Sequence, residues 1–273
     1  MREASGVSAR SPSELVDLER YPLLDLAAPR GGRLVSECRS QLGATGCCEL
    51  PAFLTAAAVE RAIADTEPLL RLAHHSEGPI QPYLEPADPS LPNDDPRRHL
   101  GRSALSAIAY DLFPPAHSLR RLYEWDPLMR FLAAALGEPE LHRYADPLGA
   151  LNVAVMEDGD ELGWHFDQTD FVTSIALRSA ERGGDFEYAP NVRRRDDEDY
   201  PAVHAVLSGD RSRVRRLGMA PGTLLLFQGR YSIHRVTEIG GGVPRLVALL
   251  AYDTKPGTVS SDLLRYARYG LGG

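Results

Sequence analysis

The part of the chain after Gly137 is broken into short segments of β-branched or alternating apolar residues, separated by Gly and Pro. Side chains alternate between the two faces of a sheet, so these segments predict short β-strands. The predicted strands span residues 151–157, 171–177, 185–188, 223–227, 232–238 and 245–252. Many short strands in succession are typical of a β-sandwich or barrel.

The first half of the chain has a different pattern. Apolar residues recur there at helical spacing, and Thr55 is a suitable N-cap for one of the helices. A further helical pattern follows Arg102 and runs through Tyr110. The other predicted helices span residues 33–42, 55–72 and 118–136. We expect this half to pack outside the barrel, which makes the fold class α+β.

One domain is expected for all 273 residues, because a content of 43% hydrophobic residues suits a single large core. Two segments, the proline-rich 77–96 and the mixed-charge 191–216, are either surface loops or lids over a site. The expected parts are a frayed terminus over 1–14, helical support over 15–137, a catalytic core over 138–257 and a tail over 258–273.

Composition narrows the class of partner. The formal net charge of −8 comes from interleaved acidic and basic residues, so no continuous cationic surface for nucleic acid is expected. The 3 cysteines lack zinc-ligand spacing and suit a reducing compartment. No signal-peptide core or membrane-spanning apolar run is recognised. We therefore expect a cytoplasmic protein that acts on a small molecule, away from membranes, and leave a homodimer open.

A histidine and a carboxylate stand one residue apart at His165 and Asp167. In an extended segment both side chains lie on the same face, where one metal ion can take both. A second histidine, His234, comes from a later predicted strand. Two histidines and one carboxylate form the ligand set that leaves positions open on a ferrous ion for an organic acid and oxygen. The pattern predicts a metal site of the kind that non-haem iron oxygenases use.

An arginine, Arg245, begins the apolar strand that follows His234. The intervening turn, residues 240–244, is rich in Gly, and we expect a hairpin that returns Arg245 to the metal. A cation on an apolar strand is costly to bury unless an anion meets it. The distal carboxylate of 2-oxoglutarate would be such an anion.

Four stretches carry a family resemblance: 159–167 (GDELGWHFD), 183–188 (GGDFEY), 221–236 (PGTLLLFQGRYSIHRV) and 244–247 (PRLV). They resemble the iron- and 2-oxoglutarate-dependent oxygenase superfamily, and within it the group that contains halogenases and hydroxylases of free amino acids such as lysine. The resemblance is strong over residues 141–257 and weak over the helical half. It implies a double-stranded β-helix, the jelly-roll relative of cupins, with iron on His165, Asp167 and His234 and 2-oxoglutarate on Arg245.

The resemblance also suggests which reaction to expect. Halogenases of this group carry a small residue in place of the iron carboxylate, which leaves room for chloride. This chain has Asp167, so hydroxylation of a free amino acid, in a natural-product setting, is the expected outcome. Desaturation or cyclisation, oxidation of a carrier-bound substrate and a cupin-like protein that holds metal without turnover remain alternatives.

Five further residues are candidates for binding. Asn152, upstream of the metal turn, either bonds 2-oxoglutarate or lies on an outer face. Arg102 suits a substrate carboxylate, because a guanidinium binds such a group bidentately. Asp146 or Asp170 would supply an anion for the substrate ammonium group. Gln168 stands where lysine-specific members are expected to carry an acid, which argues against lysine itself.

Overall fold

The computed structural model describes residues 11–86 and 88–270. Within these ranges, an 11-stranded antiparallel sheet has the order β1-β11-β7-β14-β5-β3-β6-β12-β9-β10, with β2 paired to β3. Its strands are β1 (Cys47–Leu50), β2 (His74–Ile80), β3 (Gly101–Ile108), β5 (Leu151–Met156), β6 (Glu161–His165), β7 (Val172–Arg178), β9 (Phe186–Ala189), β10 (Arg215–Leu217), β11 (Leu224–Phe227), β12 (Ile233–Val236) and β14 (Arg245–Leu250). Two small pairs join β4 (His142–Arg143) to β15 (Tyr252–Asp253) and β8 (Arg182–Gly183) to β13 (Ile239–Gly240).

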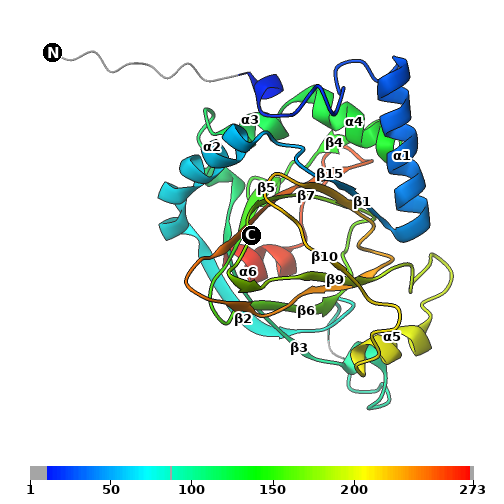
Figure 1. Ribbon diagram of the computed structural model, residues 1–273. Coiled ribbons are helices and arrows are strands. Elements are labelled where there is room, and N and C mark those ends of the chain that lie inside the picture. The colour runs from blue at the N-terminus through cyan, green and yellow to red at the C-terminus, as the bar shows by residue number, and fades with distance from the viewer. Residues whose placement is uncertain (1–10, 87, 271–273) are drawn as a thin grey trace.

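The strands from β5 onward wind between two halves of this sheet. β5, β7, β11 and β14 lie in one half, and β6, β9, β10 and β12 lie in the other. Apart from the β9–β10 pair, each successive strand crosses to the opposite half, and Figure 1 shows the halves facing each other. This winding is a double-stranded β-helix, so the predicted jelly-roll core is confirmed.

Helices cover the outer face of the β5, β7, β11 and β14 half (Figure 1). Outward residues of those strands, among them Leu151, Ile175 and Leu224, are 0% exposed and share one apolar cluster with the helices. Burial of each such side chain contributes roughly 1.5–3 kcal/mol. The helices are α1 (Pro29–Thr45), α2 (Ala56–Thr66), α3 (Ser118–Tyr123) and α4 (Asp126–Leu136). The predicted packing of helices outside the barrel is confirmed, as is the Thr55 cap, which accepts from the Ala58 N–H.

The helical pattern predicted through Tyr110 is wrong, because that segment forms β3. Ala104 and Ile108 are fully buried, and β3 pairs along one edge with β2 and along the other with β5 and β6. These pairings satisfy the backbone along the whole strand, and tertiary pairing overrides a weak local helix pattern. The strand β2 also extends to Ile80, into the segment for which a loop was predicted.

The mixed-charge segment 191–216 contains α5 (Tyr200–Leu207) and most of β10. Val203 and Val206 of α5 are buried against Trp164 and Phe166, which flank His165 on the outer side of β6. Both aromatic residues therefore pack against the helix. The segment therefore supports the strand that carries the first histidine.

No helix within the described residues is both long enough and apolar enough to span a lipid bilayer.

One buried histidine outside the site makes the stability of the fold depend on pH. His117 caps α3 by accepting a hydrogen bond from the Leu119 N–H, and it is 4% exposed. Burial lowers its pKa to about 4, although Asp65 opposes the shift. The unfolded imidazole binds a proton near pH 6.5, so the unfolded state holds more protons between pH 6.5 and 4. Stability contributed by His117 is therefore present above this window and is lost as pH falls through it.

We predict that His117→Asn, which keeps a capping acceptor, flattens the fall in unfolding free energy between pH 6.5 and 4.5. One titrating group contributes at most about 1.4 kcal/mol per pH unit. Urea denaturation of both proteins at several pH values measures the difference between the two slopes. Equal slopes would show that His117 is not a source of the acid sensitivity.

Candidate metal centre

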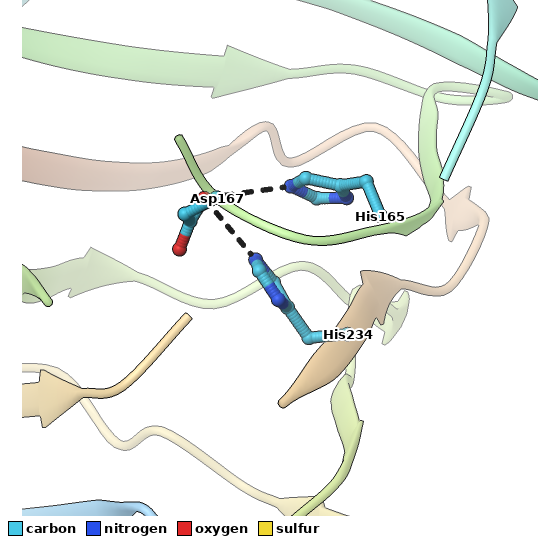
Figure 2. A group of neighbouring side chains, drawn as sticks. All are labelled: His165, Asp167 and His234. Carbon is cyan, nitrogen blue, oxygen red and sulfur yellow. Dashed lines mark ion pairs between the residues drawn. The ribbon is translucent and has the colours of Figure 1, made fainter. Parts of the chain in front are cut away.

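His165, Asp167 and His234 converge on one point inside the barrel (Figure 2). The Asp167 Oδ1 atom lies 3.8 Å from His165 Nε2 and 3.6 Å from His234 Nε2. The possible ligand atoms of the three residues all lie within 4.8 Å of one another. Such separations suit a single divalent ion about 2.1 Å from each ligand atom.

The pairing of two strands sets this geometry. His165 ends β6 and stands directly opposite His234 of β12, and the register then shifts by one residue before Val236. A shift of this kind marks a β-bulge, and bulges re-aim side chains beside active sites. Asp167 follows β6, where its N–H donates to the Gly229 carbonyl at 3.1 Å. The sheet thus fixes the imidazoles, and one backbone bond fixes the loop that carries the acid.

Backbone carbonyl groups select the ring nitrogen that each histidine offers. His165 Nδ1 lies 2.9 Å from the Gly163 carbonyl oxygen, and His234 Nδ1 lies 3.0 Å from that of Ser232. A carbonyl only accepts, so each Nδ1 carries the proton and each Nε2 has a free lone pair. These partners are not evident from the sequence, because they depend on ring orientation.

Electrostatics keep the ligand set in its metal-binding form. Burial, reinforced by the nearby His234, lowers the pKa of His165 to about 3, so this imidazole is neutral at physiological pH. Burial favours protonation of Asp167, but His234 and His165 outweigh it and lower the pKa of this carboxyl. A neutral imidazole and a carboxylate are the forms that bind metal.

A close backbone contact holds the acid of the triad. A Cβ atom on Gly229 would lie 1.6 Å from Asp167 Oδ2, so only glycine fits beside this carboxylate. Gly229 belongs to the stretch 221–236, but its role was not predicted. Nothing local in the sequence reveals a contact with a residue so distant in the chain.

Arg245 reaches the barrel interior by a different route from the one predicted. It pairs with Met156 of β5, and β14 lies between β5 and β7 in the half opposite β12. The predicted hairpin with the His234 strand is therefore wrong, because consecutive strands of a double-stranded β-helix change halves. The two strands instead approach the interior from opposite sides.

The Arg245 side chain is a buried cation beside a cavity. It is 7% exposed, and its one hydrogen bond to a described residue joins Nη1 to Met156 Sδ at 3.8 Å. Burial lowers its pKa to about 10, while Asp185 opposes the shift. Gly184, Val247 and Arg245 are among the residues that line a cavity of about 380 Å³. A desolvated guanidinium with so weak a partner is suited to bind an anion.

Asn152 lies on β5 opposite Leu249 of β14. Because side chains alternate, it shares a face with Ala154 and Met156, which pack inside the barrel, and not with the helix-covered Leu151. Asn152 therefore lies on the inner face of the sheet and not on the outer one. Contact with 2-oxoglutarate stays a prediction.

Two of the predicted substrate residues are engaged in ion pairs on the surface. Arg102 Nε lies 3.0 Å from Glu77 and its Nη1 lies 3.5 Å from Glu161, with 42% of its side chain exposed. Asp170 pairs with Arg230 at 2.5 Å and is 54% exposed. Neither has a described contact with the metal triad, and their binding roles stay predictions.

The other two predicted substrate residues contact the C-terminal segment. Asp146 is 1% exposed, and it accepts hydrogen bonds from the Leu148 and Ser260 N–H groups, each at 2.9 Å. Gln168, next to Asp167, accepts from the Ser261 hydroxyl at 3.3 Å. Their roles in substrate binding also stay predictions.

Comparisons with known proteins agree with this architecture. The family model of Halogenase D matches residues 95–262, more than half of the chain and all of the triad. Among solved structures, a 2OG-Fe(II) oxygenase family protein from Burkholderia pseudomallei is 18% identical over 82% of this chain and 92% of its own, with a TM-score of 0.52. A prolyl hydroxylase from Trichoplax adhaerens, in complex with a peptide, is 16% identical over 84% and 94%, with a TM-score of 0.54.

The epimerase SnoN, in complex with Fe3+, alpha ketoglutarate and nogalamycin RO, is 16% identical over 87% of this chain and 95% of its own, with a TM-score of 0.55. These structural similarities show a shared fold. No curated protein sequence matches the chain.

Replacing Gly229 by Ala should weaken metal binding without unfolding the protein. The added methyl group displaces the Asp167 carboxylate, and loss of support for a ligand typically costs 10- to 100-fold in affinity. We expect at least about a tenfold weaker affinity for Co2+ by calorimetry. Gly43→Ala is the matched control, because nothing lies within 4 Å of that position. Equal Co2+ affinities in the two variants would show that the close contact of Gly229 does not support the Asp167 carboxylate.

Proposed function

Because the chain belongs to the Halogenase D family, we propose that it is an Fe(II)- and 2-oxoglutarate-dependent dioxygenase that hydroxylates an unactivated C–H bond of a free amino acid. The observation that carries the proposal is the combination of two imidazoles, one carboxylate and a buried guanidinium inside a single barrel. The imidazoles and the carboxylate would bind the metal, and the guanidinium would bind a carboxylate of the co-substrate.

The donor set fits iron. His165, Asp167 and His234 would hold Fe(II) through two nitrogens and one oxygen, the facial set of non-haem iron oxygenases. Three protein ligands leave the remaining positions for 2-oxoglutarate and oxygen. With iron and 2-oxoglutarate bound, the centre would use O2 as the oxidant: 2-oxoglutarate would supply two electrons and leave as succinate, which keeps one oxygen atom, and carbon dioxide, and the C–H bond of the substrate would supply the other two electrons and take the second oxygen atom.

The protein's own residues bind and orient the reactants. Arg245 would bind the distal carboxylate of 2-oxoglutarate, because its guanidinium is buried, charged and next to a cavity. Asn152, on an inner face, would hydrogen-bond the same co-substrate. The apolar side chains of Phe186 and Phe227 pack beside His234, and they limit access of water to that side of the centre.

Asp167 favours hydroxylation over halogenation. Halogenases that this chain resembles have a small residue at this position, where halide takes the place of the acid. Here the carboxylate is held by both its backbone bond and the close approach of Gly229. While that carboxylate binds the metal, it takes the place that a halide has in those halogenases.

Two alternatives differ in what they require of the site. Desaturation or cyclisation of an amino-acid-derived or carrier-bound metabolite would use the same four residues. A cupin-like protein that only stores or senses metal would need the triad but not the buried Arg245. The cost of burying that cation favours a protein that also binds a carboxylate.

The proposed function predicts substrate-stimulated turnover of 2-oxoglutarate. We expect oxygen consumption and succinate formation to rise at least about tenfold above the uncoupled rate with one or more free amino acids, which represents about 1.4 kcal/mol of barrier. Mass spectrometry of that amino acid should show the addition of one oxygen atom. Turnover that no free amino acid stimulates would contradict the substrate class, and no turnover at all would favour the metal-storage alternative.

Arg245→Met should raise the KM for 2-oxoglutarate by about 10- to 100-fold, because a hydrogen-bonded charge pair is worth roughly 1.5–3 kcal/mol. The kcat at saturating 2-oxoglutarate should change less, since the metal ligands are untouched. Arg71→Met, at an exposed position, is the control. An unchanged KM would place the co-substrate carboxylate elsewhere.

A further inference from the structure

The C-terminal segment, for which only a tail was predicted, forms a helix, α6 (Asp262–Tyr269). It extends from the paired strands β2 and β3 to the loop that carries Asp167 and Gln168, here called the metal loop. At its end, a Cβ atom on Gly270 would lie 2.6 Å from the His74 ring. At its start, Ser261 caps the helix and donates to Gln168, the residue after Asp167. The helix is therefore held at both ends, and it packs against β2 and β3, close to which Figure 1 shows it.

One face of α6 is turned toward the metal loop. Residues three and four positions apart lie on the same side of a helix, so Ser261, Arg265 and Arg268 share a face. Ser261 contacts Gln168, and Arg265 Nε lies 3.4 Å from Asp146 Oδ2. Arg268 is the next residue along this face, one turn beyond Arg265.

The charge of Arg268 reaches the metal ligands. Burial lowers the pKa of its guanidinium, and the nearby acidic groups of Tyr269 and Asp167, of which only Asp167 is charged at neutral pH, oppose that shift. Arg268 is also one of the cations that act on Asp167, after His234 and His165. It therefore faces the same acid that the two imidazoles share.

Arg268 has no hydrogen bond or ion pair with any residue in the ranges that the structure describes. This separates it from Arg265, which contacts Asp146. A partly desolvated guanidinium without a partner gains most from an anion that arrives with a ligand. The distal carboxylate of 2-oxoglutarate has Arg245, on β14, and its C1 carboxylate would bind the iron with the keto oxygen, so the anion left for Arg268 belongs to the primary substrate.

We propose that Arg268 binds the carboxylate of the primary substrate and so acts as a carboxylate anchor. The enzyme thereby selects substrates whose oxidised carbon chain carries a free carboxylate. This inference rests on the proposed function and places the carboxylate-binding role on α6, whereas the sequence pattern predicted that role for Arg102. Because α6 also contacts Gln168 and Asp146, the anchor and the metal loop are held in one hydrogen-bonded unit.

The test compares free amino acids with their carboxamides, which differ only in the charge that Arg268 would recognise. Each compound is titrated anaerobically into the enzyme loaded with Fe(II) and 2-oxoglutarate, and the change in the visible charge-transfer band gives a Kd. For the best amino acid, Arg268→Gln should raise the Kd by about 10- to 100-fold and leave the Kd of the carboxamide unchanged. Arg268→Lys should recover part of the loss, because it restores the positive charge.

Tyr266→Gln is the matched control, since this residue lies on the same helix and is 65% exposed. A normal band with 2-oxoglutarate alone shows that each variant is folded and its metal centre intact. If the band forms and Arg268→Gln binds the amino acid as tightly as the parent protein does, the anchor role of Arg268 is refuted, but the proposed oxygenase function is not. Failure of every amino acid to change the band also refutes the anchor. Absence of the band in the parent protein refutes the oxygenase itself.

Discussion

Two imidazoles face each other across the β6–β12 pair, and every other feature of the site is placed relative to them. Backbone hydrogen bonds set the spacing of the strands, and the carbonyl groups of Gly163 and Ser232 orient the rings. Ligand atoms fixed before the metal arrives cost little ordering on binding, because the entropy was lost when the sheet formed. The outer packing of Trp164 and Phe166 against α5 supports the same strand from behind. The positions of the two imidazoles therefore depend on both the β6–β12 pairing and the packing of α5.

The two halves of the barrel supply opposite charges. The half with β6 and β12 delivers the carboxylate of Asp167, and the half with β14 delivers the buried cation of Arg245. A cation at 7% exposure, whose single described hydrogen bond is to a thioether, destabilises the empty fold. That cost becomes binding energy when a carboxylate enters the cavity. In the proposed enzyme, the same reasoning extends to Arg268, which acts from a third direction, on α6.

The sequence predicted well what is decided locally. His165 and Asp167 could be assigned as ligands because alternation along one extended segment is a local rule, and the apolar strands of the barrel are recognisable by composition. Pairing is not local. The strand β14 pairs with β5 and β7 rather than with β12, and β3 owes its extended form to neighbours on both edges. Gly229 matters only through Asp167. The short helix that carries Arg268 was also missed, because eight residues give a weak periodic pattern.

The central claim is that Fe(II) binds at His165, Asp167 and His234 with 2-oxoglutarate beside it. Anaerobic addition of Fe(II) and then 2-oxoglutarate to the apoprotein, followed by visible absorption, tests this claim most directly, because a keto acid chelated to Fe(II) gives a charge-transfer band that neither component shows alone. We predict that the band saturates at one iron per chain and is lost in Asp167→Ala. A band of equal strength in that variant, or none in the parent protein, would contradict it.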